Sequence, residues 1–268
     1  MSNVIDKTIS KTEIIESLYQ VGVREGMVLE VHSSLFSLGY VIGGAQTVVD
    51  ALLEILGEDG TLVMPLNMNE NSEVSRWENP LIEYDQIKKV RDNIPSFDKN
   101  SSDTYDGGSI VENFRRRENV VISSHPSKSF VAKGKHAYHL CNHQSLHFPL
   151  SSESPMARLY ELRAYCLLIG VGVEKCTSIH LAEYACDCRP IIVNGAAVNR
   201  NGVRVWKKYL DLKLENQDFK FPFQALDKLS RIEKGNIGLC PIALFSVNDA
   251  VDEATRYFEG FNSYSYYR

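Results

Sequence analysis

Residues 176–184, Cys-Thr-Ser-Ile-His-Leu-Ala-Glu-Tyr, contain the side chains best suited to acid–base chemistry. They are predicted to form the first turns of a helix, in which positions three or four apart share one face. His180 and Glu183 would then lie together, with Thr177 on the same side. A carboxylate beside an imidazole can fix the proton on one ring nitrogen and prepare a general base near neutral pH. A surface ion pair without chemical consequence is the alternative, because exposed pairs of this kind are common.

The composition is that of a soluble globular protein, and it limits the classes of partner. The 268 residues suit one domain, 1–268, and 44% hydrophobic with 24% charged residues is ordinary. The net charge of -5 argues against nucleic-acid binding and permits a cationic small-molecule substrate. We expect no membrane segment, because no apolar run approaches the roughly 18 residues that a spanning helix needs. Six cysteines without a secretory leader favour reduced thiols and a cytoplasmic location.

The elements that must position these side chains begin with a parallel strand–helix–strand unit. A short apolar run at 27–31 predicts a buried strand, 46–56 predicts a helix that ends at Gly57, and 61–64 predicts a second strand. The unbroken apolar run at 165–169 is typical of a central strand. The sequence therefore indicates the α/β class, with a central, mostly parallel sheet that is flanked by helices.

Capping and turn signals predict the remaining elements. Ser10 and Ser109 have capping-box spacing, and Ser154 precedes a proline as an N-cap would. An Asn-Gly pair within 198–206 predicts a hairpin, which would be one of several antiparallel additions. Residues 66–108 are polar and contain prolines, so we expect a long loop excursion that borders the site. The other predicted elements are helices at 10–22, 109–116, 154–162 and 223–232, a helix capped by Asn248, and strands at 120–123 and 239–246.

Three segments are expected to meet at one edge of this sheet. In such sheets, ligands bind at the carboxyl ends of the strands. The segments that begin at His32, Ser124 and Gly170 each follow a predicted strand. We therefore predict that all three segments converge on one crevice.

Hydroxyl groups and glycines near the first of these segments are compatible with anion binding. Ser33 and Ser34 offer hydroxyls, and Gly43 and Gly44 offer backbone amides at the start of a helix, as in a cradle for phosphate. A tight turn followed by a capped helix explains the same residues. The pattern is neither Gly-x-x-x-x-Gly-Lys-Ser/Thr nor Gly-x-Gly-x-x-Gly, and neither serine lies in Gly-x-Ser-x-Gly.

Histidine and cysteine are crowded in two places without the spacing of a zinc site. Cys186 and Cys188 are too close together for the usual Cys-x2-4-Cys pair, and no second pair has the right spacing. We expect scattered histidines, buried thiols and no metal. The histidine-rich stretch contains His136, His139, Cys141, His143 and His147.

Several motifs, in order along the chain, resemble those of the aminoglycoside 3-N-acetyltransferase family of antibiotic N-acetyltransferases. The resemblance extends from about residue 10 to residue 258, and its motifs are highly specific because several match in register. The matching motifs are Val-His-Ser-Ser-Leu at 31–35, Gly-Gly-Ala-Gln-Thr-Val at 43–48, Gly-Thr-Leu-Val-Met-Pro at 60–65, Ser-x-His-Pro-x-x-Ser-Phe-x-Ala-x-Gly at 123–134, Glu-Ser-Pro-x-x-x-Leu-Tyr-x-Leu at 153–162, Leu-Leu-Ile-Gly-Val-Gly at 167–172 and Thr-Ser-Ile-His-Leu-Ala-Glu-Tyr at 177–184.

The resemblance implies a cytoplasmic acyltransferase linked to antibiotic resistance, which transfers an acetyl group from acetyl-CoA to an amine such as the 3-amino group of an aminoglycoside. His180 matches the family's catalytic histidine and Glu183 its carboxylate partner, while Thr177 could stabilise the oxyanion. The expected partners are a small-molecule amine and, in a possible homodimer, a second copy of the chain. No nucleic acid, membrane or metal is expected. By family pattern the cofactor channel is lined by His32, Ser33, Ser34, Leu35, Gly43, Gly44, Ser129 and Phe130.

The chain departs from the family pattern on the acceptor side. Many members carry Gly-His-Asp-x-Asn-Thr where this chain has Gly-Val-Glu-Lys-Cys-Thr at 172–177. Glu174 would bind a cationic amine, together with Asp106 of the excursion, whereas Lys175 would repel one. A different amino sugar or small amine is the alternative acceptor, and a CoA-binding protein without turnover is the alternative function. Cys176 is a rival nucleophile that we interpret as a packing residue.

Overall fold

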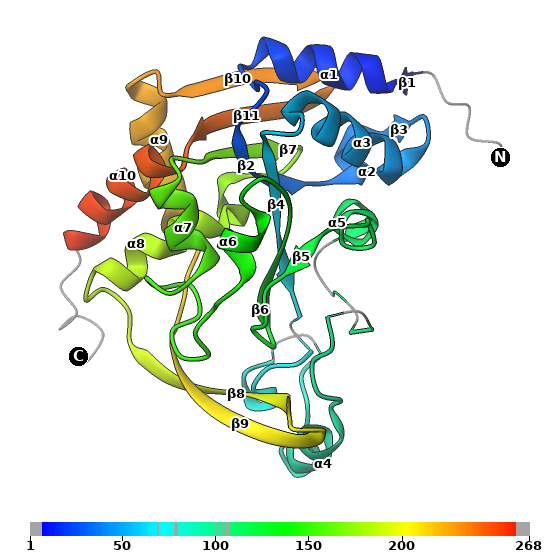
Figure 1. The fold of residues 1–268 in the computed structure, drawn as a ribbon. Helices are drawn as coiled ribbons and strands as arrows, with labels where there is room; N and C mark the ends of the chain where they lie inside the picture. The colour runs from blue at the N-terminus through cyan, green and yellow to red at the C-terminus, as the bar shows by residue number, and fades with distance from the viewer. Residues whose placement is uncertain are drawn as a thin grey trace.

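The chain folds around a sheet whose strands come from both halves of the sequence (Figure 1). The computed structural model describes residues 7–68, 70–77, 80–99, 101, 102, 104 and 108–260. Its strands are β1 (Thr8–Ile9), β2 (Val28–Ser33), β3 (Tyr40–Val41), β4 (Thr61–Asn67), β5 (Val121–Ile122), β6 (Lys128–Gly134), β7 (Tyr165–Ile169), β8 (Ile191–Arg200), β9 (Val203–Leu212), β10 (Ile232–Ile237) and β11 (Cys240–Ser246). In this part of the chain, the main sheet has seven strands in the order β10-β11-β7-β2-β4-β6-β5, and β1–β3 and β8–β9 form two further pairs.

Parallel strands form the centre of the main sheet. β2 pairs in parallel with β4 on one side and with β7 on the other. β6 and β11 add to this centre in antiparallel fashion, and β5 and β10 add antiparallel to them in turn. Consequently β10, β7, β2, β4 and β5 run in one direction. The predicted α/β class and the predicted parallel strand–helix–strand unit are both confirmed.

Helices cover both faces of the sheet and create two apolar cores (Figure 1). Side chains alternate along β7, so Leu167 and Ile169 face one core while Cys166 and Leu168 face the other. The helices are α1 (Lys11–Gln20), α2 (Leu35–Leu38), α3 (Gly44–Leu56), α4 (Ile87–Asn93), α5 (Gly108–Arg115), α6 (Ala137–Cys141), α7 (Pro155–Glu161), α8 (His180–Ala185), α9 (Lys220–Lys228) and α10 (Val247–Glu259), with 3-10 turns η1 (Val74–Arg76), η2 (Tyr84–Gln86), η3 (Val173–Lys175), η4 (Thr177–Ile179) and η5 (Gln217–Phe219). Helices α1, α3 and α5 contribute side chains to the first core, and helices α6 to α10 contribute side chains to the second.

The predicted helix caps are correct at two positions and wrong at two others. Ser10 and Ser154 cap α1 and α7, and each hydroxyl accepts a hydrogen bond from the third following backbone N–H. Ser109 lies inside α5, which already begins at Gly108. Ser246 caps α10, because its hydroxyl accepts a hydrogen bond from the N–H of Asp249. Asn248 therefore lies in the first turn of the helix and is not the cap.

The described part of residues 66–108 is more structured than the expected loop, and it packs on the β8–β9 hairpin. The side-chain amide of Asn71 donates to the carbonyl of Ala197 at 2.9 Å and accepts from its N–H at 2.8 Å. Arg204 Nε donates to the carbonyl of Ile94 at 2.6 Å. Figure 1 shows the hairpin extending away from the sheet with α4 near its tip. The excursion therefore supports the hairpin, and it reaches the sheet edge through its first residues at the end of β4.

Two further differences concern polar strands. The hairpin spans 191–212 rather than 198–206. β10 was not predicted, and the helix expected at 223–232 instead ends at Lys228. β10 lies at the edge of the sheet and carries Glu-Lys-Gly-Asn in its interior, so its sequence lacks the alternation that identifies a strand.

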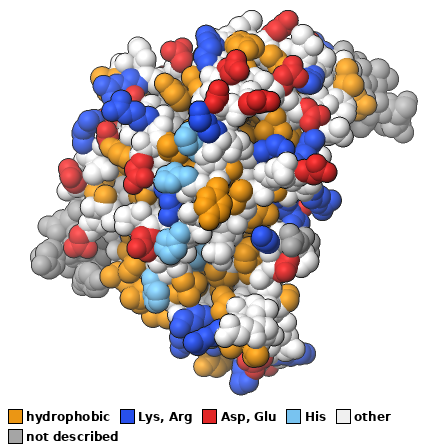
Figure 2. All heavy atoms as spheres, viewed as in Figure 1, with side chains coloured by type: hydrophobic (Ala, Val, Ile, Leu, Met, Phe, Trp, Pro, Cys, Tyr) orange, Lys and Arg blue, Asp and Glu red, His pale blue; other side chains and the backbone are white. Residues whose placement is uncertain are grey.

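The face of the molecule drawn in Figure 2 has no large patch of one charge. The face seen in Figure 2 mixes basic and acidic side chains, with histidines along its middle. His139, His143 and His147 are exposed. No described helix is both long and apolar enough to cross a membrane.

A buried histidine holds the loop that leads into β6. His125 Nδ1 accepts hydrogen bonds from the backbone N–H groups of Ser127 at 3.3 Å and Lys128 at 2.9 Å. Its Nε2 donates to the carbonyl of Leu146 at 3.2 Å. One ring nitrogen thus accepts and the other donates, as in a neutral imidazole, and burial lowers the pKa of His125 to about 3. These bonds fix the position at which Lys128 enters the sheet.

The central place of β2 predicts a large effect of truncating its core side chain. Leu29→Ala should lower the free energy of unfolding by about 2–5 kcal/mol, because Leu29 is 0% exposed. Leu239→Ala is the matched control, since Leu239 is 81% exposed, and it should change stability by less than about 0.5 kcal/mol. Urea unfolding followed by circular dichroism measures both; equal and small changes would contradict a buried β2.

The pKa of His125 predicts a loss of stability in acid. Below about pH 6.5, His125 is protonated in the unfolded chain, whereas in the folded chain it stays neutral down to about pH 3. The free energy of unfolding therefore falls as the pH falls through this range. The limiting slope is about 1.4 kcal/mol per pH unit. His125→Asn should lose this component, whereas His139→Asn, at an exposed histidine, should keep the wild-type slope. Urea unfolding at several pH values tests this, and identical slopes in wild type and His125→Asn would refute it.

Candidate active site

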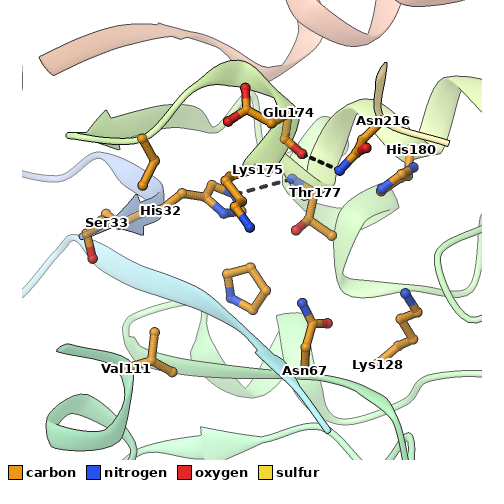
Figure 3. Close-up of a pocket in the computed structure, with 13 residues that line it drawn as sticks. His32, Ser33, Asn67, Val111, Lys128, Glu174, Lys175, Thr177, His180 and Asn216 are labelled. Atoms are coloured by element: carbon orange, nitrogen blue, oxygen red, sulfur yellow. Dashed lines mark hydrogen bonds between the residues drawn. The ribbon is translucent and has the colours of Figure 1, made fainter. Parts of the chain in front are cut away.

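A cavity of about 310 Å³ lies at the carboxyl ends of the parallel strands (Figure 3). The predicted convergence of three segments is confirmed there, because His32, Lys128 and Val171 come from the first, second and third segment. The register Ser33↔Ile169 explains the first and third, since it brings the ends of β2 and β7 together. The lining residues are Val31, His32, Ser33, Pro65, Asn67, Val111, Lys128, Val171, Glu174, Lys175, Thr177, His180 and Asn216.

His180 and Glu183 meet at one end of this cavity, as the spacing predicted. α8 begins at His180, after the 3-10 turn η4, so both side chains lie on its first turn. His180 Nδ1 is hydrogen-bonded to Glu183 Oε2. The His180 side chain is 15% exposed whereas that of Glu183 is 0% exposed. The dyad is therefore not a surface ion pair: its carboxylate is sealed inside and its imidazole faces the cavity.

The buried carboxylate of Glu183 has a second set of partners that keeps it charged. Arg189 Nε donates to Glu183 Oε1 at 2.5 Å, and the backbone N–H of Glu215 donates to the same oxygen at 3.3 Å. Arg189 also donates to Asp218 at 3.2 Å. A buried carboxylate needs such pairing to stay ionised. With both Glu183 oxygens occupied, the proton of the His180 ring is directed to Nδ1, and Nε2 is left as the proton acceptor on the cavity side.

Sequence reasoning missed Arg189, although it lies only six residues after Glu183. Its position depends on the turn between α8 and β8 and on residues 215–218, which return to the same place after the hairpin. The ring of Phe219 in that return segment also packs on His180, with ring centroids 4.8 Å apart. No local pattern reveals these long-range contacts.

α8 is anchored on its other side to the root of the hairpin. The hydroxyl of Tyr184 donates to Asp211 at 2.5 Å. Burial raises the pKa of Tyr184, so this hydroxyl remains a neutral donor. Burial also raises the pKa of Asp211. The helix that carries His180 is thus fixed from two directions.

The acceptor-side predictions have different outcomes. Thr177 and Glu174 both line the cavity, and Lys175 lines it beside them (Figure 3). The carbonyl of Glu174 accepts a hydrogen bond from Asn216 Nδ2 at 3.0 Å. Asp106 lies outside the described residues.

The residues expected to bind the cofactor start at the cavity and continue away from it. His32 and Ser33 line the cavity, and Ser33 Oγ is buried without a hydrogen-bond partner among the described residues. Ser34 caps α2, of which Leu35 is the first residue, and its hydroxyl accepts from the N–H of Ser37 at 3.2 Å. Ser33 is thus a lining residue with a buried hydroxyl that has no partner among the described residues.

Gly43 and Gly44 form the start of α3 and leave it uncapped by any side chain. Their φ angles are 80° and 61°, a region that favours glycine. A Cβ on Gly43 would lie 2.4 Å from Thr47 Oγ1, so glycine is required there on packing grounds as well. No side chain therefore caps the first N–H groups of α3, the kind of position at which helices bind anionic groups.

The side chains of Ser129 and Phe130 do not line this cavity, and their contact with the cofactor stays a prediction. Both are buried, at 0% and 1% exposure. Ser129 Oγ lies 3.0 Å from the carbonyl of Ser123, and Phe130 packs in the second core. The residue of this motif that lines the cavity is Lys128, which stands where β6 begins. The sheet is covered on both faces, so the inner residues of β6 stabilise the loop that presents Lys128.

The comparisons with known proteins agree with the motifs. The family model described as aminoglycoside 3-N-acetyltransferase matches residues 31–259. The chain is 37% identical over 262 residues to the SPbeta prophage-derived aminoglycoside N(3')-acetyltransferase-like protein YokD of Bacillus subtilis (strain 168), covering 96% of each chain. The crystal structure of YokD superposes with a TM-score of 0.91 at 38% identity and covers 94% of each chain.

Two solved structures with ligands share the same fold. AAC-VIa bound to sisomicin matches with a TM-score of 0.81 at 26% identity, covering 94% of this chain and 98% of that one. AAC-IIIb, solved as a binary complex with CoASH, matches with a TM-score of 0.84 over 94% of this chain and 97% of that one, and at 20% identity it shows the fold alone. With a family model that covers most of its length, this chain belongs to the aminoglycoside 3-N-acetyltransferase family, whose members are acyltransferases.

Proposed function

We propose that this protein transfers the acetyl group of acetyl-CoA to an amine of an aminoglycoside, at the 3-amino group, or of a related amino compound, with His180 as the general base. The observation that carries this proposal is the His180–Glu183–Arg189 chain, which directs an imidazole nitrogen into the cavity. Family membership supports the reaction class. The sisomicin complex of AAC-VIa supports an aminoglycoside as the class of acceptor.

His180 would remove the proton that prevents the amine from attacking. An ammonium group has no lone pair, so one proton must leave before the nitrogen bonds to the thioester carbonyl carbon. Nε2 of His180 accepts this proton, and Glu183 stabilises the resulting imidazolium. As the carbon–sulfur bond breaks, the proton returns to the departing CoA thiolate. The attacking nitrogen still carries one extra proton, which passes to solvent as the tetrahedral intermediate collapses. The balanced products are therefore an N-acetyl amine, CoA thiol and one released proton, with no acyl-enzyme.

The cavity offers donors for the oxyanion of the tetrahedral intermediate. The Thr177 hydroxyl lies one turn before His180 and lines the same cavity. Lys128 and Asn67 line it from the strands on the opposite side (Figure 3). Donors that are fixed in place before the reaction stabilise developing charge without reorganisation. We assign this role to Thr177 first, because it belongs to the same short segment as the base.

The two substrates would occupy different ends of the site. The donor end includes His32, Ser33, Ser34 and Leu35, and it continues to Gly43 and Gly44, where the open amides of α3 suit the phosphates of CoA. The acceptor end includes Glu174, an exposed carboxylate that would attract a cationic amine. Direct transfer requires the thioester to lie between these ends, near His180.

Replacing the proposed base should greatly lower the turnover rate and leave the binding of acetyl-CoA nearly unchanged. His180→Ala should lower kcat by about 10²–10⁴-fold, because a positioned imidazole contributes about that much, and should leave the affinity for acetyl-CoA within about threefold. Thiol release from acetyl-CoA, measured across aminoglycosides, amino sugars and simple amines, provides the assay. His147→Ala, at an exposed histidine, is the control and should retain wild-type rates.

Two results would overturn this assignment. If no amine in the panel releases thiol while acetyl-CoA still binds, the chain is a CoA-binding protein without turnover. If His180→Ala loses cofactor affinity as much as turnover, the histidine has a structural role. A histidine base also requires a rate that rises with pH, so a flat profile between about pH 5.5 and 8.5 argues against it.

Comparing Glu183→Gln with Glu174→Gln distinguishes the carboxylate that positions His180 from the carboxylate that is proposed to bind the acceptor amine. Glu183→Gln should lower kcat by about tenfold or more, because the neutral amide no longer stabilises the imidazolium. It should also lower the free energy of unfolding by about 1–3 kcal/mol, less than is typical for a broken buried pair, since Arg189 keeps Asp218 as a partner. Glu174→Gln is the control: it should raise KM for the amine and leave stability unchanged. Equal kinetic effects of the two variants would contradict the division of roles.

A further inference from the structure

Four side chains with metal-binding atoms meet directly behind the cavity wall. Glu30, His32, Cys166 and Cys176 each offer one ligand atom, and all four atoms lie within 4.8 Å of one another. Glu30, Cys166 and Cys176 are at most 1% exposed, and His32 is 8% exposed. Among the residues that the structure describes, no other group of histidine, cysteine and acidic side chains has such an arrangement.

The fold assembles this cluster from three separate segments. Glu30 and His32 lie two residues apart on β2, so both face the second core. Cys166 on β7 is the direct register partner of Glu30. Cys176 follows η3 and immediately precedes Thr177. Sequence spacing cannot reveal such a site, because its residues are not grouped in any motif.

The charge balance of the cluster calls for a cation. The Glu30 carboxylate is fully buried. The Ser178 hydroxyl donates to it, His32 Nε2 lies 2.9 Å from Oε1, and the Cys166 thiol is a further hydrogen-bond partner. The structure gives Glu30 no lysine or arginine partner among the described residues. Buried carboxylates in proteins are usually paired with a cation or bound to a metal. His32 supplies a positive charge only if it is protonated.

Two of the distances within the cluster are close to those of tetrahedral coordination. Cys166 Sγ and Cys176 Sγ are 3.5 Å apart, and His32 Nε2 and Glu30 Oε1 are 2.9 Å apart. Bonds of about 2.3 Å to sulfur and 2.0 Å to nitrogen or oxygen place tetrahedral ligand atoms roughly 3.3 to 3.8 Å from one another. Movements of a few tenths of an ångström would bring these two pairs to such distances, and the other pairs lie within the 4.8 Å that encloses all four atoms.

We propose that Glu30, His32, Cys166 and Cys176 bind one divalent cation of the zinc class. Two thiolates and an imidazole select a borderline-soft ion over magnesium or calcium. Binding releases the two thiol protons to solvent, and the four ligands with the cation carry a net charge of -1, from two thiolates, one carboxylate and a 2+ ion. All four positions come from the protein, so the ion has a structural role and polarises no substrate.

Such an ion would fix the segment that leads into the active site. Cys176 is covalently joined to Thr177, and Ser178 donates to the second oxygen of Glu30. The ion would thus bind the start of η4 to β2 and β7, with Ser178 orienting the carboxylate ligand. The inference concerns metal binding and does not depend on the proposed acetyl transfer.

Metal content and cobalt spectroscopy test this site without an activity assay. Protein purified from zinc-supplemented cells without chelator should contain about one zinc per chain. The reduced, metal-free protein should develop thiolate-to-cobalt charge-transfer absorption and the bands of tetrahedral Co²⁺ when Co²⁺ is added. Cys166→Ala/Cys176→Ala should lose both signals, whereas Cys240→Ala, at a buried thiol on another strand, should keep them.

A conservative variant guards against loss of folding in the double variant. Glu30→Gln keeps the size of the side chain and should weaken Co²⁺ binding by about tenfold or more while the circular dichroism spectrum is unchanged. Wild-type protein without stoichiometric zinc and without cobalt charge transfer would overturn the site, as would unchanged signals in the double cysteine variant. Unreduced protein that is two hydrogens lighter, with Cys166 and Cys176 in one linked peptide and no bound metal, would identify the pair as a disulfide instead.

Discussion

The site depends on one buried charge, the carboxylate of Glu183. It is held between the imidazole of His180 and the guanidinium of Arg189, at 0% exposure. Such a charge is destabilising unless each oxygen has a partner, so the fold must bring Arg189 and the backbone of Glu215 to it. That requirement links α8 to the segment after β9, because Arg189 also pairs with Asp218. The orientation of the imidazole follows from this network rather than from the helix alone.

The parallel centre of the sheet determines what His180 faces. Parallel strands end at the same edge, so side chains at the ends of β2 and β4 and just after β7 surround one space. Antiparallel β6 starts at that edge instead of ending there, which is why Lys128, at its beginning, joins the lining while Ser129 and Phe130 are buried further along the strand. Because the strands run in both directions, the last residues of β2 and β4 and the first residue of β6 lie around the same cavity.

The sequence predicted the features that local periodicity determines. The strand–helix–strand unit, the central strand at 165–169 and the shared face of His180 and Glu183 all follow from spacing. Spacing could not show which residues of the motif at 123–134 face the cavity, which Lys128 lines while the side chains of Ser129 and Phe130 are buried. Spacing could not find Arg189 or Asn216 either. Arg189 precedes the hairpin and Asn216 follows it, and only the folded hairpin brings the segment around Asn216 back beside Arg189 and Glu174. β10 was missed because an edge strand with polar residues has no apolar face to reveal it.

The residues from Cys176 to Glu183 are held at both ends, and this explains how so short a segment can position reacting groups. At the first end, the Ser178 hydroxyl donates to Glu30, which ties the segment to β2. At the other end, Glu183 is tied to Arg189. The intervening chain is a 3-10 turn followed by one turn of α-helix, which is marginal by itself. Tertiary anchors must therefore supply the rigidity that a general base and an oxyanion donor need, since misplacement of either by about 1 Å can cost about 10²-fold in rate. The buried polar residues beneath the cavity thus contribute to function through geometry, because they fix the distance between Thr177 and His180.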